Sequence, residues 1–552
     1  MIADIHITEK SFGDNTLMKD VKFSVDDGEK VGVVGRNGVG KSTLFGILSG
    51  KDTDYTGEVI FRRGITVATT AQEHHGLGDQ TVMAYILSGL PEYSKLKKII
   101  DEYPLTMGDN MRKIEEYTQA LERFDQKGFY QVEEKIEREL SNFQLDGYGN
   151  RKISSLSGGQ KRLVEIVKIM HSEAHLALVD EPTNHMDYVA KQQFIDWMNS
   201  QPHQAMLIIT HDRDVLGQVD RIVEIKDGQA VSYRGNYDAY LKQNAQATTA
   251  GMNNFEQIEK RIVNLKQKVL DYQRLKEKSR NPGTIQKFKR LENEARAELA
   301  ELSEMDKPTF WIDKESASQL DYKSAERYGK FKSRNIRLSM KDASSRSQHV
   351  LVRAENVAVG IGERILFEDV NIDLREGEAI EIRGRNGAGK TTLIRMILAS
   401  GKSFDDGPIL YSGDIFLDPQ VRIGVYEQEI DERYLSDPLE KAIEKLYMSR
   451  DLSISDTKIR QLLADYLFTD ADRMTPLARL SGGQKARFQI IAMLANDPQL
   501  LILDEPTNHL DLPSIEELET ALAKYSGAIL YVSHDNYFRE KLGGKVVQIG
   551  AE

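Results

Sequence analysis

The sequence contains no cysteine in its 552 residues. That absence excludes disulfide bonds, thiolate zinc sites, iron–sulfur clusters and cysteine nucleophiles together, and a reducing compartment is permitted. No apolar run approaches the roughly 20 residues that a membrane-spanning helix needs, so we do not expect a membrane channel. Residues 1–7 alternate apolar and polar side chains and lack the basic and apolar regions of a secretory signal, and we interpret them as a strand.

An excess of basic residues is also missing, because 74 Lys and Arg stand against 86 Asp and Glu, a formal net charge of -12. A protein that neutralises phosphates usually needs a basic face, so an evenly distributed charge of this sign would argue against nucleic-acid binding. The charge is not evenly distributed. Between Ile258 and Arg290 there are 11 basic and three acidic residues, which gives this segment a net charge of +8. The local sign therefore permits a nucleic-acid partner that the total disfavours.

The chain contains an internal repeat, within a length that corresponds to roughly three to four folding units. Four blocks occur twice in the same order: Gly35–Ser42 and Gly384–Thr391, Leu156–Gln160 and Leu480–Gln484, Asp180–His185 and Asp504–His509, His211-Asp212 and His534-Asp535. The spacing between matching blocks falls from 349 to 324 residues, so the first copy holds a net surplus of 25 residues. We place that surplus in residues 79–145, where Ile114, Tyr117, Leu121 and Phe124 have helical spacing, and predict a helical arm there.

A second helical feature lies between the copies, in residues 255–305. Ser-Arg-Asn-Pro-Gly-Thr at 279–284 is a loop signal followed by a helix restart. Apolar residues on both sides recur at steps of three and four: Ile258, Ile262, Leu265, Val269 and Tyr272, then Leu291, Ala295, Leu299 and Leu302. Such a narrow seam predicts an antiparallel coiled-coil hairpin of about 25 residues per leg with its tip at about 279–285. A solvated linker would instead have mixed charges and more Gly and Ser.

Each copy contains the pattern Gly-x-x-x-x-Gly-Lys-Ser/Thr after an apolar strand and before a helical segment. The pattern places backbone N–H groups and a helix N-terminus around phosphates, with the lysine at the β and γ oxygens and the hydroxyl on Mg²⁺. A glycine turn that only caps a helix is the alternative, but the strand–loop–helix context favours phosphate binding. The predicted residues are Gly35, Asn37, Gly38, Gly40, Lys41, Ser42 and Thr43, and Gly384, Asn386, Gly387, Gly389, Lys390, Thr391 and Thr392.

A buried-strand pattern ends in an Asp-Glu pair in both copies. The aspartate is placed to hold Mg²⁺ beside the phosphate loop, and the glutamate can orient and polarise the attacking water. A histidine follows a second apolar strand and can reach the γ-phosphate from the same sheet edge. An acid in a surface loop or a structural histidine is the alternative, but repetition in register favours the catalytic interpretation. The two sets are Asp180, Glu181 and His211, and Asp504, Glu505 and His534.

With Gln72, Gln428 and the two Leu-Ser-Gly-Gly-Gln blocks, these motifs resemble the ATP-binding-cassette superfamily over residues 1–245 and 350–552. The resemblance implies an α/β fold with two P-loop cassettes arranged head to tail around two ATP molecules. Each phosphate loop would face the other copy's Leu-Ser-Gly-Gly-Gln block. The implied ATP contacts are Gln72, Ser157, Gly158, Gly159, Gln160, Gln428, Ser481, Gly482, Gly483 and Gln484, and the implied Mg²⁺ ligands are Ser42, Gln72, Asp180, Thr391, Gln428 and Asp504.

Two positions depart from strict repetition. Members of the superfamily usually stack adenine on an aromatic residue, which Phe12 supplies in the first copy, whereas Ile361 stands at the matching point of the second. We therefore expect nucleotide affinity to differ between the sites. Met186 replaces the leucine found at Leu510, a volume-conserving change from which we expect little.

Tandem cassettes with an arm in the first (about 79–145) and a linker hairpin at 246–349 resemble the ABC-F family. The resemblance implies a cytoplasmic, monomeric ATPase that binds the ribosome, its 23S rRNA and P-site tRNA, through a hairpin in the tRNA exit site. ATP would close the cassettes and hydrolysis would release the protein. The expected RNA-binding residues are Lys276, Lys278, Arg280, Lys287, Lys289 and Arg290. Residues 307–316 resemble the connector of the antibiotic-resistance subgroup, so displacement of ribosome-targeting drugs is a further expectation.

Three alternatives remain. One is a general translation factor without a role against drugs. Another is the ATPase of a membrane transporter, docked on separate membrane subunits, although such ATPases lack a long basic hairpin. The third is a DNA-repair ATPase, but those proteins carry a far longer coiled coil inside a cassette rather than between cassettes.

Overall fold

The computed structural model describes the chain except residues 13–14, 71–78, 109, 185, 304–310, 312, 314–315, 318–323, 326–327, 329, 331, 333–334, 339–348, 403–406, 428–429 and 551–552. The chain divides into two compact units. One unit combines Met1–Tyr237 with Ile336–Glu552, and the other is Asp238–Asn335. Within the described residues, no helix has both the length and the hydropathy needed to cross a membrane.

The first copy contains two sheets. An antiparallel sheet has the order β2 (Asn15–Val25), β1 (Ala3–Phe12), β4 (Thr56–Phe61). A second sheet has the order β5 (Val67–Thr69), β6 (Leu176–Asp180), β7 (Ala205–Ile209), β3 (Lys30–Gly35), β8 (Arg221–Lys226), β9 (Gln229–Arg234), and it is parallel except for the last pair. Strands β6 and β7 are buried along their whole length, because helices cover a parallel sheet and both faces of such strands must be apolar.

The second copy repeats this plan. Its antiparallel sheet has the order β11 (Arg364–Arg375), β10 (Val350–Ile361), β13 (Pro408–Leu417). Its parallel sheet has the order β14 (Ile423–Tyr426), β15 (Leu500–Asp504), β16 (Ala528–Val532), β12 (Ala379–Arg383), β17 (Lys545–Gln548). Because β3 and β6 correspond to β12 and β15, equivalent motifs follow equivalent strands in the two copies.

The helices that carry motifs also correspond. In the first copy they are α1 (Lys41–Leu48), α6 (Gly158–His171), α7 (Tyr188–Ser200) and α8 (Arg213–Leu216). In the second copy they are α13 (Lys390–Leu398), α18 (Gly482–Leu494), α19 (Leu512–Ala523) and α20 (Asn536–Leu542), and a further group comprises α14 (Glu432–Leu435), α15 (Leu439–Met448), α16 (Asp456–Asp465) and α17 (Asp470–Arg473).

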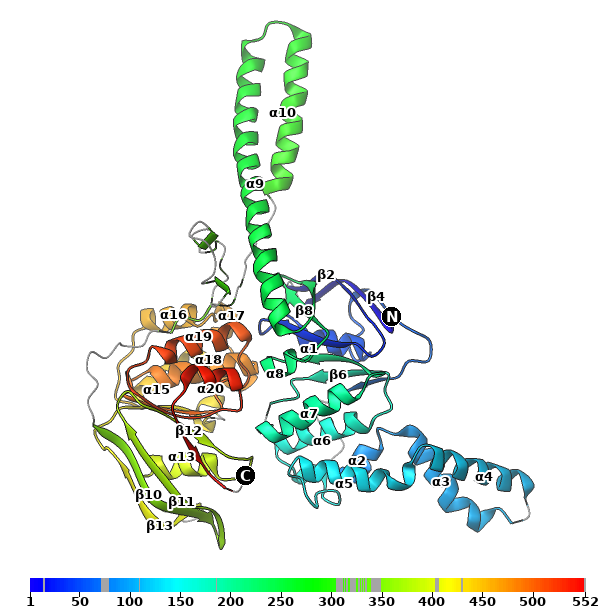
Figure 1. The fold of residues 1–552 in the computed structure, drawn as a ribbon. Coiled ribbons are helices and arrows are strands. Elements are labelled where there is room, and N and C mark those ends of the chain that lie inside the picture. Colours follow the sequence, from blue (N-terminus) through cyan, green and yellow to red (C-terminus); the bar gives the residue numbers. More distant parts are fainter. Residues whose placement is uncertain are drawn as a thin grey trace. The chain divides into compact units, whose positions relative to one another are not determined.

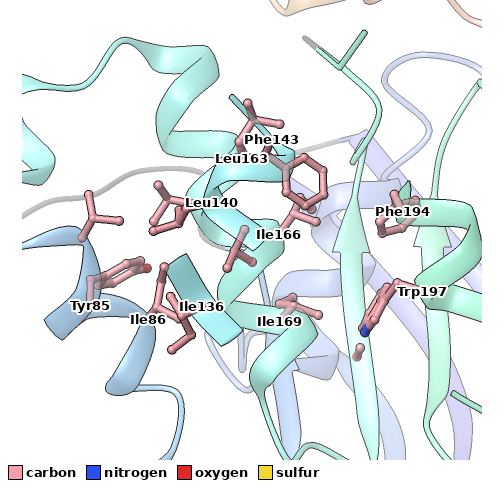
Figure 2. Packing of buried hydrophobic residues seen from close by; sticks show 14 of the residues in the cluster. Tyr85, Ile86, Ile136, Leu140, Phe143, Leu163, Ile166, Ile169, Phe194 and Trp197 are labelled. Atoms are coloured by element: carbon pink, nitrogen blue, oxygen red, sulfur yellow. The ribbon is translucent and has the colours of Figure 1, made fainter. Parts of the chain in front are cut away.

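The surplus segment of the first copy is helical. It forms α2 (Val82–Leu87), α3 (Pro91–Thr106), α4 (Met111–Gln126) and α5 (Val132–Asn142), and Figure 1 shows α3 and α4 running side by side. Their apolar faces join α6 in one cluster, in which Ile86, Ile136 and Leu140 are fully buried (Figure 2). The arm is therefore continuous with the cassette core through α2, α5 and α6.

The second unit contains a helical hairpin of α9 (Tyr237–Lys278) and α10 (Pro282–Ser303), drawn in green in Figure 1. Leu265, Val269 and Ala295 are buried in its seam, as the apolar spacing predicts. Pro282 begins α10, where its missing N–H costs no helical hydrogen bond. The first leg begins at Tyr237 rather than Phe255, since the polar, Ala-rich sequence between them contains a single glycine and no proline. Helix α9 thus runs through the boundary predicted at 245/246, and the domain limits stay a prediction.

Candidate nucleotide-binding sites

Each phosphate loop lies between a central strand and a helix. In the first copy, Gly38 and Gly40 have φ of 86° and 99°, and Gly40 is the N-cap of α1. A Cβ on Gly40 would lie 2.8 Å from the Leu17 side chain, so only glycine fits there. The Lys41 ammonium folds back over the loop and donates to the carbonyl of Gly35 at 2.7 Å. The loop thus places a cation beside the N-terminus of α1, which is an anion-binding arrangement.

The second loop has the same geometry. Gly387 and Gly389 have φ of 78° and 98°, and Gly389 is the N-cap of α13. Lys390 Nζ donates to the carbonyl of Gly384 at 2.9 Å. Thr43 and Thr392 lie two residues after the lysines, in the first turn of each helix. Each loop therefore brings its predicted residues together in one place.

A hydroxyl and a carboxylate meet beside each loop. Ser42 Oγ donates to Asp180 Oδ2 at 3.1 Å, and Thr391 Oγ1 donates to Asp504 Oδ2 at 2.7 Å. The aspartates end β6 and β15, so the parallel sheets place them at the same edge as the phosphate loops. The hydroxyl and the carboxylate both offer oxygen atoms, which are the ligands that Mg²⁺ prefers.

The next residue in each copy has an unusual backbone. Glu181 and Glu505 have φ of 46° and 51°, which lies in the left-handed region that residues other than glycine rarely adopt. The Glu181 N–H donates to the carbonyl of Ile209 at 2.7 Å, and the Glu505 N–H donates to that of Val532 at 3.0 Å. These bonds to the neighbouring strand hold the strained turn and aim both carboxylates at the sheet edge.

A histidine faces each of these glutamates. His211 Nε2 lies 3.5 Å from Glu181 Oε1, and His534 Nε2 lies 3.3 Å from Glu505 Oε1. Burial raises the pKa of Glu181, and it raises the pKa of Glu505 to about 7. Burial also lowers the pKa of His211 and lowers the pKa of His534 to about 3, so both rings are neutral at pH 7.

The His211 ring has room for a polar ligand. Among the described residues neither of its buried ring nitrogens has a hydrogen-bond partner, and the same holds for His534 Nε2. A buried polar atom without a partner is costly unless something else satisfies it. These atoms therefore mark where a bound phosphate or water fits.

The Leu-Ser-Gly-Gly-Gln blocks begin helices. Ser157 caps α6 and Ser481 caps α18, each in a capping box with the glutamine three residues later, Gln160 or Gln484. Their glycines leave the helix N-terminus open. A Cβ on Gly483 would lie 1.9 Å from the Asn37 side chain, so glycine is required where the first copy's phosphate loop approaches the second copy's block.

The second site is assembled from both copies. A cavity of about 1120 Å³ is lined by the second copy's Gly387, Gly389, Lys390, Thr391, Thr392, Asp504, Glu505 and His534 and by the first copy's Ser157, Gly158, Gly159 and Gln160. This is the head-to-tail pairing that the resemblance to the superfamily implies. The same cavity extends to Glu181 and His211 of the first site. Ile361 lines the same cavity together with Arg364 and Leu366. That Ile361 stands at the adenine-stacking position stays a prediction.

The first site is closed by direct bonds between the copies. The Asn37 N–H donates to Asp511 Oδ2 at 3.1 Å, and Asn37 Nδ2 donates to the carbonyl of His509 at 2.9 Å. Gln72 and Gln428 lie outside the described residues, as does the side chain of Phe12 at the end of β1.

Two aspartates outside the repeated motifs also lie at these sites. Asp187 Oδ1 caps α7 while its Oδ2 accepts the Asn386 N–H at 3.0 Å, and Asp511 does the same for α19 and Asn37. Burial acts to raise their pKa values, but hydrogen bonds outweigh it and both pKa values are lowered. At Asp187 the bonds come from the Ala190 and Asn386 N–H groups, and at Asp511 from Ser514 first and then from the Asn37 N–H. A signal was present, because an aspartate precedes a helix at the same place in both copies.

The predicted RNA-binding residues lie on α9, α10 and the turn between them. Lys278, Arg280, Lys287 and Lys289 are exposed, and none forms an ion pair within the described part of the chain. Lys276 differs because its ammonium lies 2.6 Å from Glu292 Oε2, across the hairpin. Arg290 pairs with Glu294 at 2.8 Å.

Comparison with known proteins agrees with the two nucleotide-binding halves. The family model described as ABC transporter matches residues 18–184 and 367–508. The putative ATP-binding protein YdiF of Bacillus subtilis is 30% identical over 100% of this chain and 80% of that protein. The ribosome protection protein VmlR of Bacillus subtilis is 27% identical over 96% of this chain and 83% of that protein.

A solved structure shares the fold. A chain in the complex of archaeal ribosomal stalk protein aP1 and archaeal ribosome recycling factor aABCE1 superposes with a TM-score of 0.57 and 17% identity, covering 99% of this chain and 88% of that one. The chain therefore belongs to the ATP-binding-cassette family and, within it, to the ABC-F proteins. It is an ATPase with two cassette domains.

Proposed function

We propose that this ATPase binds the ribosome through its hairpin, and that the state of its two ATP sites controls the association. The observation that carries the proposal is the separation of charge, because an acidic chain places a segment of +8 on a slender hairpin. The exposed lysines at the turn can contact phosphates without distorting the helices that hold them. The relative named as a ribosome protection protein supports the same partner.

Mg²⁺ fits both sites. Within the described residues no group of three or more His, Asp or Glu could hold a metal ion by itself. Each site instead offers one hydroxyl and one carboxylate oxygen, Ser42 with Asp180 and Thr391 with Asp504. That number suits Mg²⁺, which is usually held by one or two carboxylates together with substrate phosphates. When bound, the ion would neutralise charge on the phosphates, and Gln72 and Gln428 are predicted to join it.

The chain's own residues supply the remaining chemistry. Lys41 and Lys390 are placed to bind the phosphates, and the signature serines Ser157 and Ser481 to complete each site from the opposite copy. A carboxylate whose pKa is about 7, as at Glu505, can orient water and accept its proton near neutral pH. Each ATP would contact both copies only when they are together, so bound ATP favours the closed form. Hydrolysis removes this contact and allows the two copies to separate.

The test uses a variant that binds ATP but hydrolyses it very slowly, which we call the trapped variant. Glu181→Gln with Glu505→Gln removes both carboxylates without changing their size, so the variant is expected to bind ATP, to hydrolyse it at least about 100-fold more slowly and to co-sediment with ribosomes. The matched control adds Lys41→Ala and Lys390→Ala, which should abolish retention. Retention of the trapped variant on membranes or DNA after ribosome depletion would favour a transporter or DNA-repair ATPase instead.

Displacement of ribosome-bound drugs is the finer part of the proposal. Residues 280–285, which comprise the end of the turn and the start of α10, would lie deepest in the ribosome. The trapped variant bound to ribosomes should release a labelled drug of the right class, and replacing this turn by Gly and Ser should abolish release but not binding. A general translation factor would leave every tested drug in place.

A further inference from the structure

The two sites differ in how the opposite copy holds the histidine loop. Lys191, on α7 of the first copy, is 4% exposed and lines the cavity that contains the second site. Its ammonium donates to the backbone carbonyl of His534 at 2.8 Å. A buried ammonium of one copy thus holds the main chain of the residue that faces Glu505 in the other.

The same loop is held at a second point. Asp214 pairs with Lys191 and accepts a hydrogen bond from Asn536 Nδ2 at 2.8 Å, two residues after His534. Asp212 Oδ2 lies 3.3 Å from the Lys191 ammonium. Two carboxylates fix the ammonium from its own copy, so its remaining donor is directed at the histidine loop.

The corresponding contact cannot form at the other site. The repeat places Ile515 opposite Lys191, and Tyr537 opposite Asp214. An isoleucine side chain has no donor for the carbonyl of His211. The contact from Lys191 to the main chain of the histidine loop is therefore present in one direction only. The first histidine loop is held across the copies in a different way, by Arg213, which donates to Glu519 at 2.8 Å. Neither Lys191 nor Asp214 belongs to the repeated motifs.

We infer that Lys191 is a positioning residue for hydrolysis at the second site, where it aligns His534 with Glu505 only while the two copies are together. The inference rests on the roles proposed above for these two residues. A hydrogen bond to the main chain fixes the loop without touching the nucleotide. Its loss should therefore slow the chemical step and leave ATP binding almost unchanged.

The test isolates each site in turn. In a Glu181→Gln background only the second site hydrolyses, and Lys191→Met there is expected to lower kcat about tenfold with KM for ATP within about twofold. The matched control is Ile515→Met in a Glu505→Gln background, which should change neither constant. Lys191→Arg, which keeps a donor, should recover part of the lost rate.

Two further variants separate positioning from folding. The double variant Lys191→Met with Asp214→Asn removes one buried positive and one buried negative charge, so the net charge at this place is that of the parent. It still lacks the donor to the carbonyl of His534. Its thermal unfolding temperature should therefore return toward that of the parent while kcat stays low. Recovery of kcat in this double variant, or an unchanged kcat in Lys191→Met, would overturn the inference. If the variant with Glu181→Gln and Glu505→Gln still hydrolyses ATP, the proposed catalytic roles fail instead.

Discussion

The compact unit and the hairpin are stabilised in different ways. The compact unit has clusters of several dozen buried apolar side chains, including β6 and β7 without a single exposed residue. The hairpin buries Leu265, Val269 and Ala295 and adds ion pairs such as Lys276 with Glu292. Hydrophobic burial thus fixes the ATP sites, whereas a thin seam leaves nearly all of the hairpin's surface available for contact with a partner.

The largest expected difference is in the response to a lost core side chain. Leu207→Ala in β7 removes a fully buried residue and should cost about 2–5 kcal/mol of unfolding free energy, lowering the temperature at which ATPase activity is lost. Leu265→Ala in the hairpin should leave that temperature unchanged. Equal losses in both variants, measured by heat inactivation, would show that the two units unfold together.

Charge reversal should affect only the hairpin. Lys278→Glu with Lys287→Glu and Lys289→Glu is expected to weaken ribosome binding about 100-fold at physiological salt, because three phosphate contacts become repulsive. Lys276 is left in place because it holds Glu292. Reversal of Lys19, Lys22 and Lys51, exposed on the compact unit, changes the net charge equally and should weaken binding far less. Basal ATPase activity should be unchanged in both variants.

The two units should also lose stability in different pH windows. In the compact unit, burial lowers the pKa of His171 from 6.5 to about 4, and its Nε2 has no partner among the described residues. The unfolded state binds this proton first, so stability is lost as pH falls from about 6.5 to 4, by about 2 kcal/mol at pH 5. His171→Asn should reduce the loss, as measured by urea unfolding at pH 7 and pH 5.

The stability of the hairpin should change at lower pH than that of the compact unit, and this change is the smallest of the expected effects. Hydrogen bonds, that from Lys276 first, hold the pKa of Glu292 at about 2, so its contribution is complete above about pH 4.5 and is lost as pH falls toward 2. Glu292→Gln should lower the helical content of a heated sample at pH 7 but not at pH 2. A difference of equal size at both values would contradict this origin.

The features that could be predicted from the sequence are those that occur in both copies. Both phosphate loops, both Asp-Glu pairs and both signature serines lie where the motifs place them, because each motif specifies its own local backbone. The motifs could not identify Lys191, since its partner lies in the other copy and no local pattern encodes that distance. The repeated aspartate before a helix indicated Asp187 as a helix cap but not its contact with the other copy. The start of α9 was misplaced for a related reason, because its first turns lack the apolar spacing that marks a packed helix face.

The carboxylates of Asp187 and Asp511 have one further consequence. In each, one oxygen caps its own helix and the other accepts a backbone N–H from the opposite copy. Separation of the copies exchanges the second bond for water and leaves the first intact. The contact between the copies can therefore be broken and remade over many cycles while both helices keep their N-terminal caps.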